Sequence, residues 1–178
     1  MKKRISALIP VAAFAVIVAF LGYRLFDQSR RPVELPSVRI GKPAPDMSLP
    51  PLLEGAAPLD SGFYEGRVAV VNFFASWCGP CAEEHPYLME LSKRPDIVLV
   101  GVNYKDRNGR DWIAKRGNPY AVIGDDSKGV ATINFGVYGL PETFLIDSAG
   151  IVRVRYAGAL TGKVWAEKFE PLLGMNKP

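Results

Sequence analysis

The chain has 178 residues, of which 48% are apolar, enough for one folded domain with a packed core. Its net charge of +4 comes from the N-terminus: residues 1–39 hold seven Lys or Arg and two acids, whereas residues 40–178 hold fifteen and sixteen. The folded part is therefore almost neutral, which excludes the broad basic surface of a nucleic-acid-binding protein.

The stretch Ile5 to Tyr23 is the one segment that departs from globular composition, with nineteen residues and no charge. As a helix it would span about 29 Å, close to the roughly 30 Å hydrocarbon core of a bilayer. We therefore predict a cytoplasmic tip and single-pass anchor over residues 1–26. Two alternatives are a buried core helix and a cleaved signal peptide, for which the small residues Ala13 and Ala15 are suitable.

A proline-rich segment follows, with six prolines between Asp27 and Pro51. Prolines remove backbone donors and favour extended chain, so residues 27–45 are predicted to be a linker. Residues 46–178 are predicted to form the folded domain.

Within this domain, apolar runs and stop signals predict alternating strands and helices. The expected elements are an irregular hairpin at 46–64, strands at 68–74, 97–102, 120–123, 143–146 and 151–156, and helices at 79–93, 107–116, 126–135 and 161–173. Asp126 or Ser127 and then Thr161 are expected helix caps. The order predicts a mixed α/β sandwich, with a parallel sheet that ends in an antiparallel hairpin.

The two cysteines of the chain, Cys78 and Cys81, stand where a predicted buried strand ends and a helix begins. Free N–H groups and the helix dipole stabilise an anion there, so the Cys78 pKa should be low and its thiolate should attack disulfides. Cys81, one turn into the helix and shielded, can resolve the mixed disulfide. The pair thus predicts thiol–disulfide exchange.

The cysteines could instead belong to a zinc site, a structural bridge or an unreactive buried pair, and each of these fits less well. Zinc needs four ligands and the only histidine is His85, so we expect no metal site. A disulfide across two residues removes little chain entropy, which argues against a purely structural bridge. Two unreactive buried thiols would not need this strand-to-helix position. We expect no cofactor other than the Cys78–Cys81 disulfide.

The run Trp77-Cys78-Gly79-Pro80-Cys81 resembles the active site of the thioredoxin superfamily. Further runs, Gly41-Lys-Pro-Ala-Pro-Asp46, Cys81-Ala-Glu-Glu-His-Pro86, Gly101-Val-Asn-Tyr-Lys-Asp106 and Gly136-Val-Tyr-Gly-Leu-Pro141-Glu-Thr-Phe144, resemble the membrane-tethered cytochrome c biogenesis oxidoreductases called CcmG, DsbE or CycY. The resemblance covers residues 40 to 165. It implies a thioredoxin-like fold of the TlpA and CcmG type.

The resemblance also implies partners and a location. It implies a protein of the bacterial inner membrane, with its soluble domain in the periplasm, that reduces the haem-binding cysteines of apocytochrome c beside the haem-attachment machinery. Electrons would come from a transmembrane donor of the DsbD or CcdA kind. Two alternatives stay open: a general exported disulfide reductase of the TlpA type, and a tethered apocytochrome-binding module that uses its cysteines little.

Several residues around the cysteines are candidates for partner binding. They are Trp77, Gly79, Pro80, Tyr138, Leu140, Pro141 and Glu142. The alternative is ordinary packing for Trp77, a core or surface filler for Tyr138, and a trans proline that opens a strand for Pro141. The resemblance implies a cis peptide bond at Pro141, facing the cysteines. Glu142 is expected to tune the cysteines or to contact the partner, and the pair Gly79-Pro80 resembles reducing thioredoxin.

Glu84 is the candidate proton acceptor, because it lies three residues after Cys81 on the same helix. Its alternative is a solvated surface residue, as expected for Glu83. Thioredoxins have a buried aspartate where this chain has Asn72, which cannot accept a proton, and this departure favours Glu84 as the substitute. His85 is expected to point away from the thiols as a surface neighbour, and Pro86 to be a structural kink.

Overall fold

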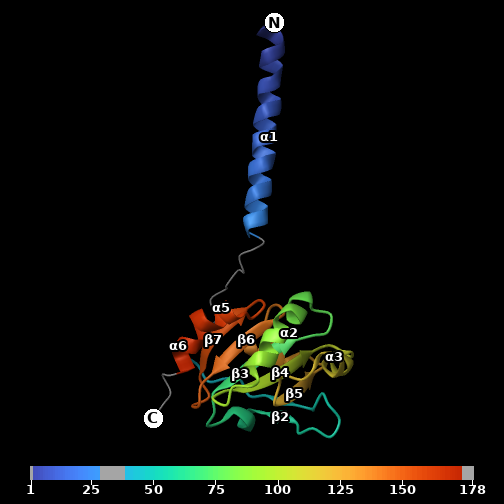
Figure 1. The fold of residues 1–178 in the computed structure, drawn as a ribbon, viewed down its shortest axis with the longest axis vertical. Coiled ribbons are helices and arrows are strands. Elements are labelled where there is room, and N and C mark those ends of the chain that lie inside the picture. The colour runs from blue at the N-terminus through green and yellow to red at the C-terminus, as the bar shows by residue number, and fades with distance from the viewer. Residues whose placement is uncertain (1, 29–38, 174–178) are drawn as a thin grey trace. The chain divides into compact units, whose positions relative to one another are not determined.

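The computed structural model describes residues 2–28 and 39–173. The chain divides into two compact units, Met1–Val33 and Glu34–Pro178, and the first contains helix α1 (Lys2–Gln28) (Figure 1). Searched over the described residues, no helix combines the length and apolar character needed to cross a membrane. The anchor over residues 1–26 therefore stays a prediction, and residues 29–38 of the predicted linker lie outside the described residues.

The second unit is built on a five-stranded sheet with the order β5-β4-β3-β6-β7. Its strands are β3 (Ala69–Phe74), β4 (Val98–Tyr104), β5 (Val122–Asp126), β6 (Glu142–Ile146) and β7 (Val152–Ala157). The pairs β3–β4 and β4–β5 are parallel, whereas β3–β6 and β6–β7 are antiparallel. The predicted mixed sheet with a terminal antiparallel hairpin is confirmed.

Two apolar cores lie on the two faces of this sheet, because successive side chains of a strand point to opposite faces. On β3, Val70 and Phe74 belong to one core, whereas Val71 and Phe73 belong to the other. All six residues of β3 are buried, as expected for a central strand covered on both sides.

Helices α2 (Gly79–Leu91) and α3 (Gly109–Arg116) and the C-terminal helical segment contribute to the first core, through residues such as Leu88, Ile113 and Phe169. Figure 1 shows α2 across this face of the sheet. Helix α4 (Val130–Phe135) contributes Phe135 to the second core, and the N-terminal hairpin of β1 (Ser48–Leu49) and β2 (Leu59–Asp60) contributes Leu59. A short 3-10 helix, η1 (Ser61–Tyr64), follows this hairpin.

Several element boundaries differ from the prediction by a few residues. Strand β5 spans Val122–Asp126, not 120–123, and Tyr120 lies before it with its side chain in the first core. Helix α4 begins after Gly129, yet the Asp126 carboxylate still accepts N–H bonds from Ala131 and Thr132, at 3.2 and 2.9 Å.

The predicted C-terminal helix is divided into α5 (Gly162–Val164), a π-helical turn η2 (Trp165–Phe169) and α6 (Glu170–Leu173). Thr161 is the expected cap, since its side chain accepts the Val164 N–H.

Candidate active site

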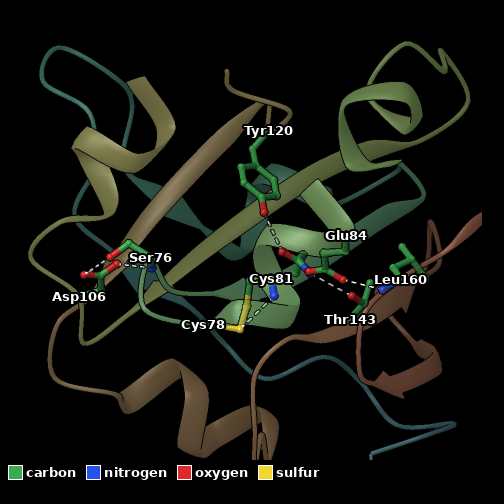
Figure 2. The surroundings of a disulfide bond; sticks show 9 residues. Ser76, Cys78, Cys81, Glu84, Asp106, Tyr120, Thr143 and Leu160 are labelled. Atoms are coloured by element: carbon green, nitrogen blue, oxygen red, sulfur yellow. Dashed lines mark hydrogen bonds between the residues drawn. A yellow bond between two sulfur atoms is a disulfide. The ribbon is translucent and has the colours of Figure 1, made fainter. Parts of the chain in front are cut away.

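Cys78 and Cys81 are joined by a disulfide at the N-terminus of α2 (Figure 2). Cys78 is the N-cap residue, and its Sγ accepts the Cys81 N–H at 3.2 Å. An N–H group in this position stabilises a thiolate on Cys78 when the pair is reduced. Cys78 is 6% exposed and Cys81 is 1% exposed, so the first cysteine is the more accessible residue of the two, as the sequence predicts.

The loop in front of Cys78 is held by Asp106, which follows β4 (Figure 2). The Asp106 carboxylate accepts the Ser76 N–H at 2.6 Å and the Ser76 hydroxyl at 3.0 Å. It also accepts the Asn108 N–H at 3.0 Å, which ties the start of α3 to the same point. Sequence reasoning missed this contact, although Asp106 stands in one of the runs that carry the family resemblance.

Glu84 is buried on the face of α2 that Cys81 occupies, three residues earlier, with 1% of its surface exposed. Its Oε2 accepts the Leu160 N–H at 2.7 Å, and its Oε1 accepts an N–H of Asn72 at 2.8 Å. Burial raises the pKa of Glu84 from 4.5 to about 7, although both hydrogen bonds oppose the rise. Near neutral pH this carboxyl group can therefore either hold or accept a proton, and Glu83 beside it is exposed.

An apolar pocket of about 250 Å³ lies between the Cys78 loop and the loop before β6. Its walls are Trp77, Tyr104, Thr132, Val137, Tyr138, Gly139 and Leu140. Trp77 is 63% exposed and Tyr138 is 50% exposed, so both aromatic side chains present exposed surface at this pocket. Three predicted candidates thus meet in one pocket, and sequence reasoning missed Tyr104, Thr132, Val137 and Gly139.

The remaining binding candidates fall into two groups. Gly79 and Pro80 form the exposed first turn of α2, beside the disulfide. The Leu140–Pro141 peptide bond is cis, as the family resemblance implies, and Pro141 is buried.

Glu142 is fully buried at the start of β6 and pairs with the Arg155 guanidinium group. It also accepts the Tyr138 N–H at 3.3 Å, while Arg155 donates to the Gly136 carbonyl at 2.9 Å. Burial raises the pKa of Glu142, and Arg155 opposes that rise. The buried Glu142 carboxylate and Arg155 tie together the loop of residues 136–142, and the expected role of Glu142 toward the cysteines or a partner stays a prediction.

His85 is not the surface neighbour that the sequence suggests, since only 3% of it is exposed. Its ring lies edge-on to Trp112 with centroids 4.6 Å apart, and its Nε2 lies 3.3 Å from the Arg116 carbonyl oxygen. Pro86 lies inside α2, as expected. Across residues 2–28 and 39–173, no group of three or more His, Cys, Asp or Glu is placed to hold a metal ion.

Comparison with known proteins identifies the family of this chain. The model of the Redoxin family matches residues 39–168. The thiol:disulfide interchange protein DsbE of Escherichia coli is 41% identical over 175 residues, covering 96% of this chain and 94% of that protein. DsbE of Pseudomonas aeruginosa is 39% identical over 172 residues, covering 96% and 93%. The chain belongs to the DsbE family.

Solved structures agree with this assignment. The crystal structure of a putative DsbE from Chlorobium tepidum superposes with a TM-score of 0.67 at 26% identity, covering 79% of this chain and all of that one. The solution structure of a putative thioredoxin from Neisseria meningitidis has a TM-score of 0.63 at 23% identity, with coverages of 75% and 91%, and supports the thioredoxin-like fold alone.

As a DsbE-family protein, this chain is a thiol–disulfide oxidoreductase. The more accessible Cys78 suits attack on a disulfide, and the shielded Cys81 suits resolution of the mixed disulfide that results. In this structure the pair is oxidised, as a Cys78–Cys81 disulfide.

Proposed function

We propose that this protein reduces the disulfide formed by the haem-binding cysteines of apocytochrome c during cytochrome c maturation. The observation that carries the proposal is a disulfide at a helix N-terminus with a buried carboxyl group, Glu84, one turn along the same face. Near neutral pH, Glu84 is divided between its two protonation states, which suits a group that must both accept and return a proton. The similarity to DsbE proteins supports the same substrate class.

The proposed reaction starts from the reduced pair. The Cys78 thiolate attacks one sulfur of the substrate disulfide, and the other substrate sulfur leaves as a thiolate. Glu84 accepts the Cys81 proton, and the Cys81 thiolate then attacks Cys78 Sγ. The Cys78–Cys81 disulfide forms, and the substrate leaves as a dithiol after taking up the proton that Glu84 returns and one proton from water. Two electrons thus pass from the protein to the substrate.

The pocket beside Cys78 supports binding of a peptide segment. Trp77 and Tyr138 offer exposed aromatic surface, and Leu140 is the residue before the cis peptide bond. Aromatic side chains bind partners with little loss of conformational entropy because they have few rotatable bonds. We propose that the residues flanking the substrate cysteines pack in this pocket.

A reductase in an oxidising compartment needs electrons, and a transmembrane donor of the DsbD or CcdA kind is proposed to supply them. The uncharged run Ile5–Tyr23 supports a proposed inner-membrane anchor with the second unit in the periplasm. Alkaline extraction of membranes should leave the full chain in the pellet and release a variant that lacks residues 2–26. Release of the full chain would disprove the anchor.

Trapping of mixed disulfides tests the substrate. In a Cys81→Ser variant the complex at Cys78 cannot be resolved, so its trapped partners can be identified by mass spectrometry. Apocytochrome c should be prominent among them, and it should be absent from the matched control, which carries Cys78→Ser as well. Recovery of unrelated proteins alone would favour a general reductase, and full function in a Cys78→Ser variant would favour a binding module.

A further inference from the structure

A row of residues beneath Glu84 crosses three adjacent strands at one level of the sheet. Asn72 of β3 is paired with Gly101 of β4 on one side and with Thr143 of β6 on the other. Asn72 and Thr143 are both fully buried, on the face of the sheet covered by α2. A buried amide must have its hydrogen-bonding groups satisfied, so the partners of Asn72 are significant for the carboxyl group above it.

Gly101 allows the side chain of Tyr120 to reach this row. A Cβ on Gly101 would lie 2.8 Å from Cδ2 and 2.9 Å from Cγ of the Tyr120 ring, closer than side-chain carbons approach. The ring also stacks on Phe74, with centroids 5.2 Å apart and an interplanar angle of 18°. Held in this way, the Tyr120 hydroxyl lies 2.7 Å from Oδ1 of Asn72.

The hydrogen bonds of this group have a fixed direction. Oδ1 of an asparagine only accepts, so the Tyr120 hydroxyl must be the donor. The Asn72 amino group is then left to donate to Glu84 Oε1 at 2.8 Å and to Thr143 Oγ1 at 3.0 Å (Figure 2 shows Tyr120, Glu84 and Thr143 converging). A flipped amide would place Oδ1 against the carboxylate, acceptor to acceptor.

We propose that Tyr120 and Asn72 are positioning residues, which keep an N–H donor on Oε1 of Glu84 and hold this carboxyl group in place for proton exchange with Cys81. The inference rests on the proposed role of Glu84 in proton transfer. Asn72 and the Leu160 N–H bond to Glu84 directly, Thr143 and Tyr120 bond to Asn72, and Cys81 lies three residues earlier on the same helix. The donor on Oε1 stabilises the charged form and so opposes the effect of burial on the Glu84 pKa.

The test replaces the donor while keeping the ring. Tyr120→Phe still fills the space over Gly101, but Oδ1 of Asn72 loses the hydroxyl donor that distinguishes it from the amino group and so orients the amide. In the full-length oxidised protein, the titration midpoint of Glu84, followed by carbon NMR of its labelled carboxyl group, should rise by roughly half to one pH unit. Asn72→Leu removes the donor outright and should shift the midpoint further. The pH profile of the rate of disulfide reduction should move in the same direction by a similar amount.

A matched control is Tyr87→Phe, because Tyr87 is a half-buried tyrosine on α2, the helix that carries Glu84. It should leave the Glu84 midpoint unchanged. The positioning role would be overturned if the Glu84 midpoint were unshifted in both Tyr120→Phe and Asn72→Leu. If Glu84→Gln still changed the pH profile of the reduction rate, the proposed function would stand. A pH profile unaffected by Glu84→Gln would instead remove proton transfer by Glu84, and the positioning role with it.

Discussion

The buried Glu84 carboxyl group should make the oxidised protein lose stability as the pH rises. Its pKa is about 7 in the folded protein, against 4.5 in an unfolded chain. Between these values the unfolded chain releases a proton that the folded protein keeps, so the contribution of Glu84 to stability is fully present below pH 4.5 and is lost as the pH rises through 7. At about 1.4 kcal/mol per pKa unit, the loss amounts to about 3 kcal/mol.

Denaturant unfolding of the oxidised protein at a series of pH values measures this loss. The free energy of unfolding of the parent protein, minus that of Glu84→Gln, should fall by about 3 kcal/mol between pH 4 and pH 8. Subtraction also removes the opposite contribution of His85, whose pKa is lowered by burial, so that it destabilises the fold as the pH falls. Glu83→Gln, at the exposed neighbouring position, should give a curve parallel to that of the parent. A parallel curve for Glu84→Gln as well would refute the reasoning.

Three further substitutions have defined outcomes. Trp77→Ala removes a side chain that is 63% exposed, so the KM for a disulfide-bonded peptide should rise several-fold while the melting temperature stays within about 2 °C. Gly101→Ala places a Cβ 2.8 Å from the Tyr120 ring and should lower the free energy of unfolding by about 1–3 kcal/mol in denaturant titrations. Arg155→Met leaves the fully buried Glu142 without its cation. It should cost about 3–5 kcal/mol at pH 8 and less at pH 5, where Glu142 can take up a proton, as followed by thermal melts at both values.

Local patterns predicted most of the fold because each depends on residues close together in the chain. The apolar run before Cys78 predicts a buried strand, and β3 is buried at all six positions. Helix stop signals set the end of α3 at Arg116 and of α4 at Phe135, each followed by a glycine with positive φ. The π-helical turn at Trp165–Phe169 was not predicted, because a continuous helical pattern does not encode a local change in hydrogen bonding.

In the candidate site, too, the features set by short-range spacing were predictable, whereas those that depend on tertiary packing were not. Helical spacing alone places Glu84 on the face of Cys81, and the position of the cysteines after a strand predicts their helix N-terminus. The expectation that Glu142 tunes the cysteines or contacts the partner rests on its position in the family motif, which gives no information on burial. The pairing of Glu142 with Arg155, thirteen residues away across the β6–β7 hairpin, depends on strand register.

The sequence by itself determined the chemistry of this protein: two cysteines at a strand-to-helix junction, with a carboxyl group one turn further on, are placed by short-range geometry. Only the tertiary structure decided the environment of that carboxyl group. The contact of Glu84 with Leu160 spans 76 residues and that of Asn72 with Tyr120 spans 48, and both exist because sheet pairing and core packing bring distant segments together. Burial, and with it the raised pKa of Glu84, is a property of the assembled fold, since desolvation needs neighbours on every side.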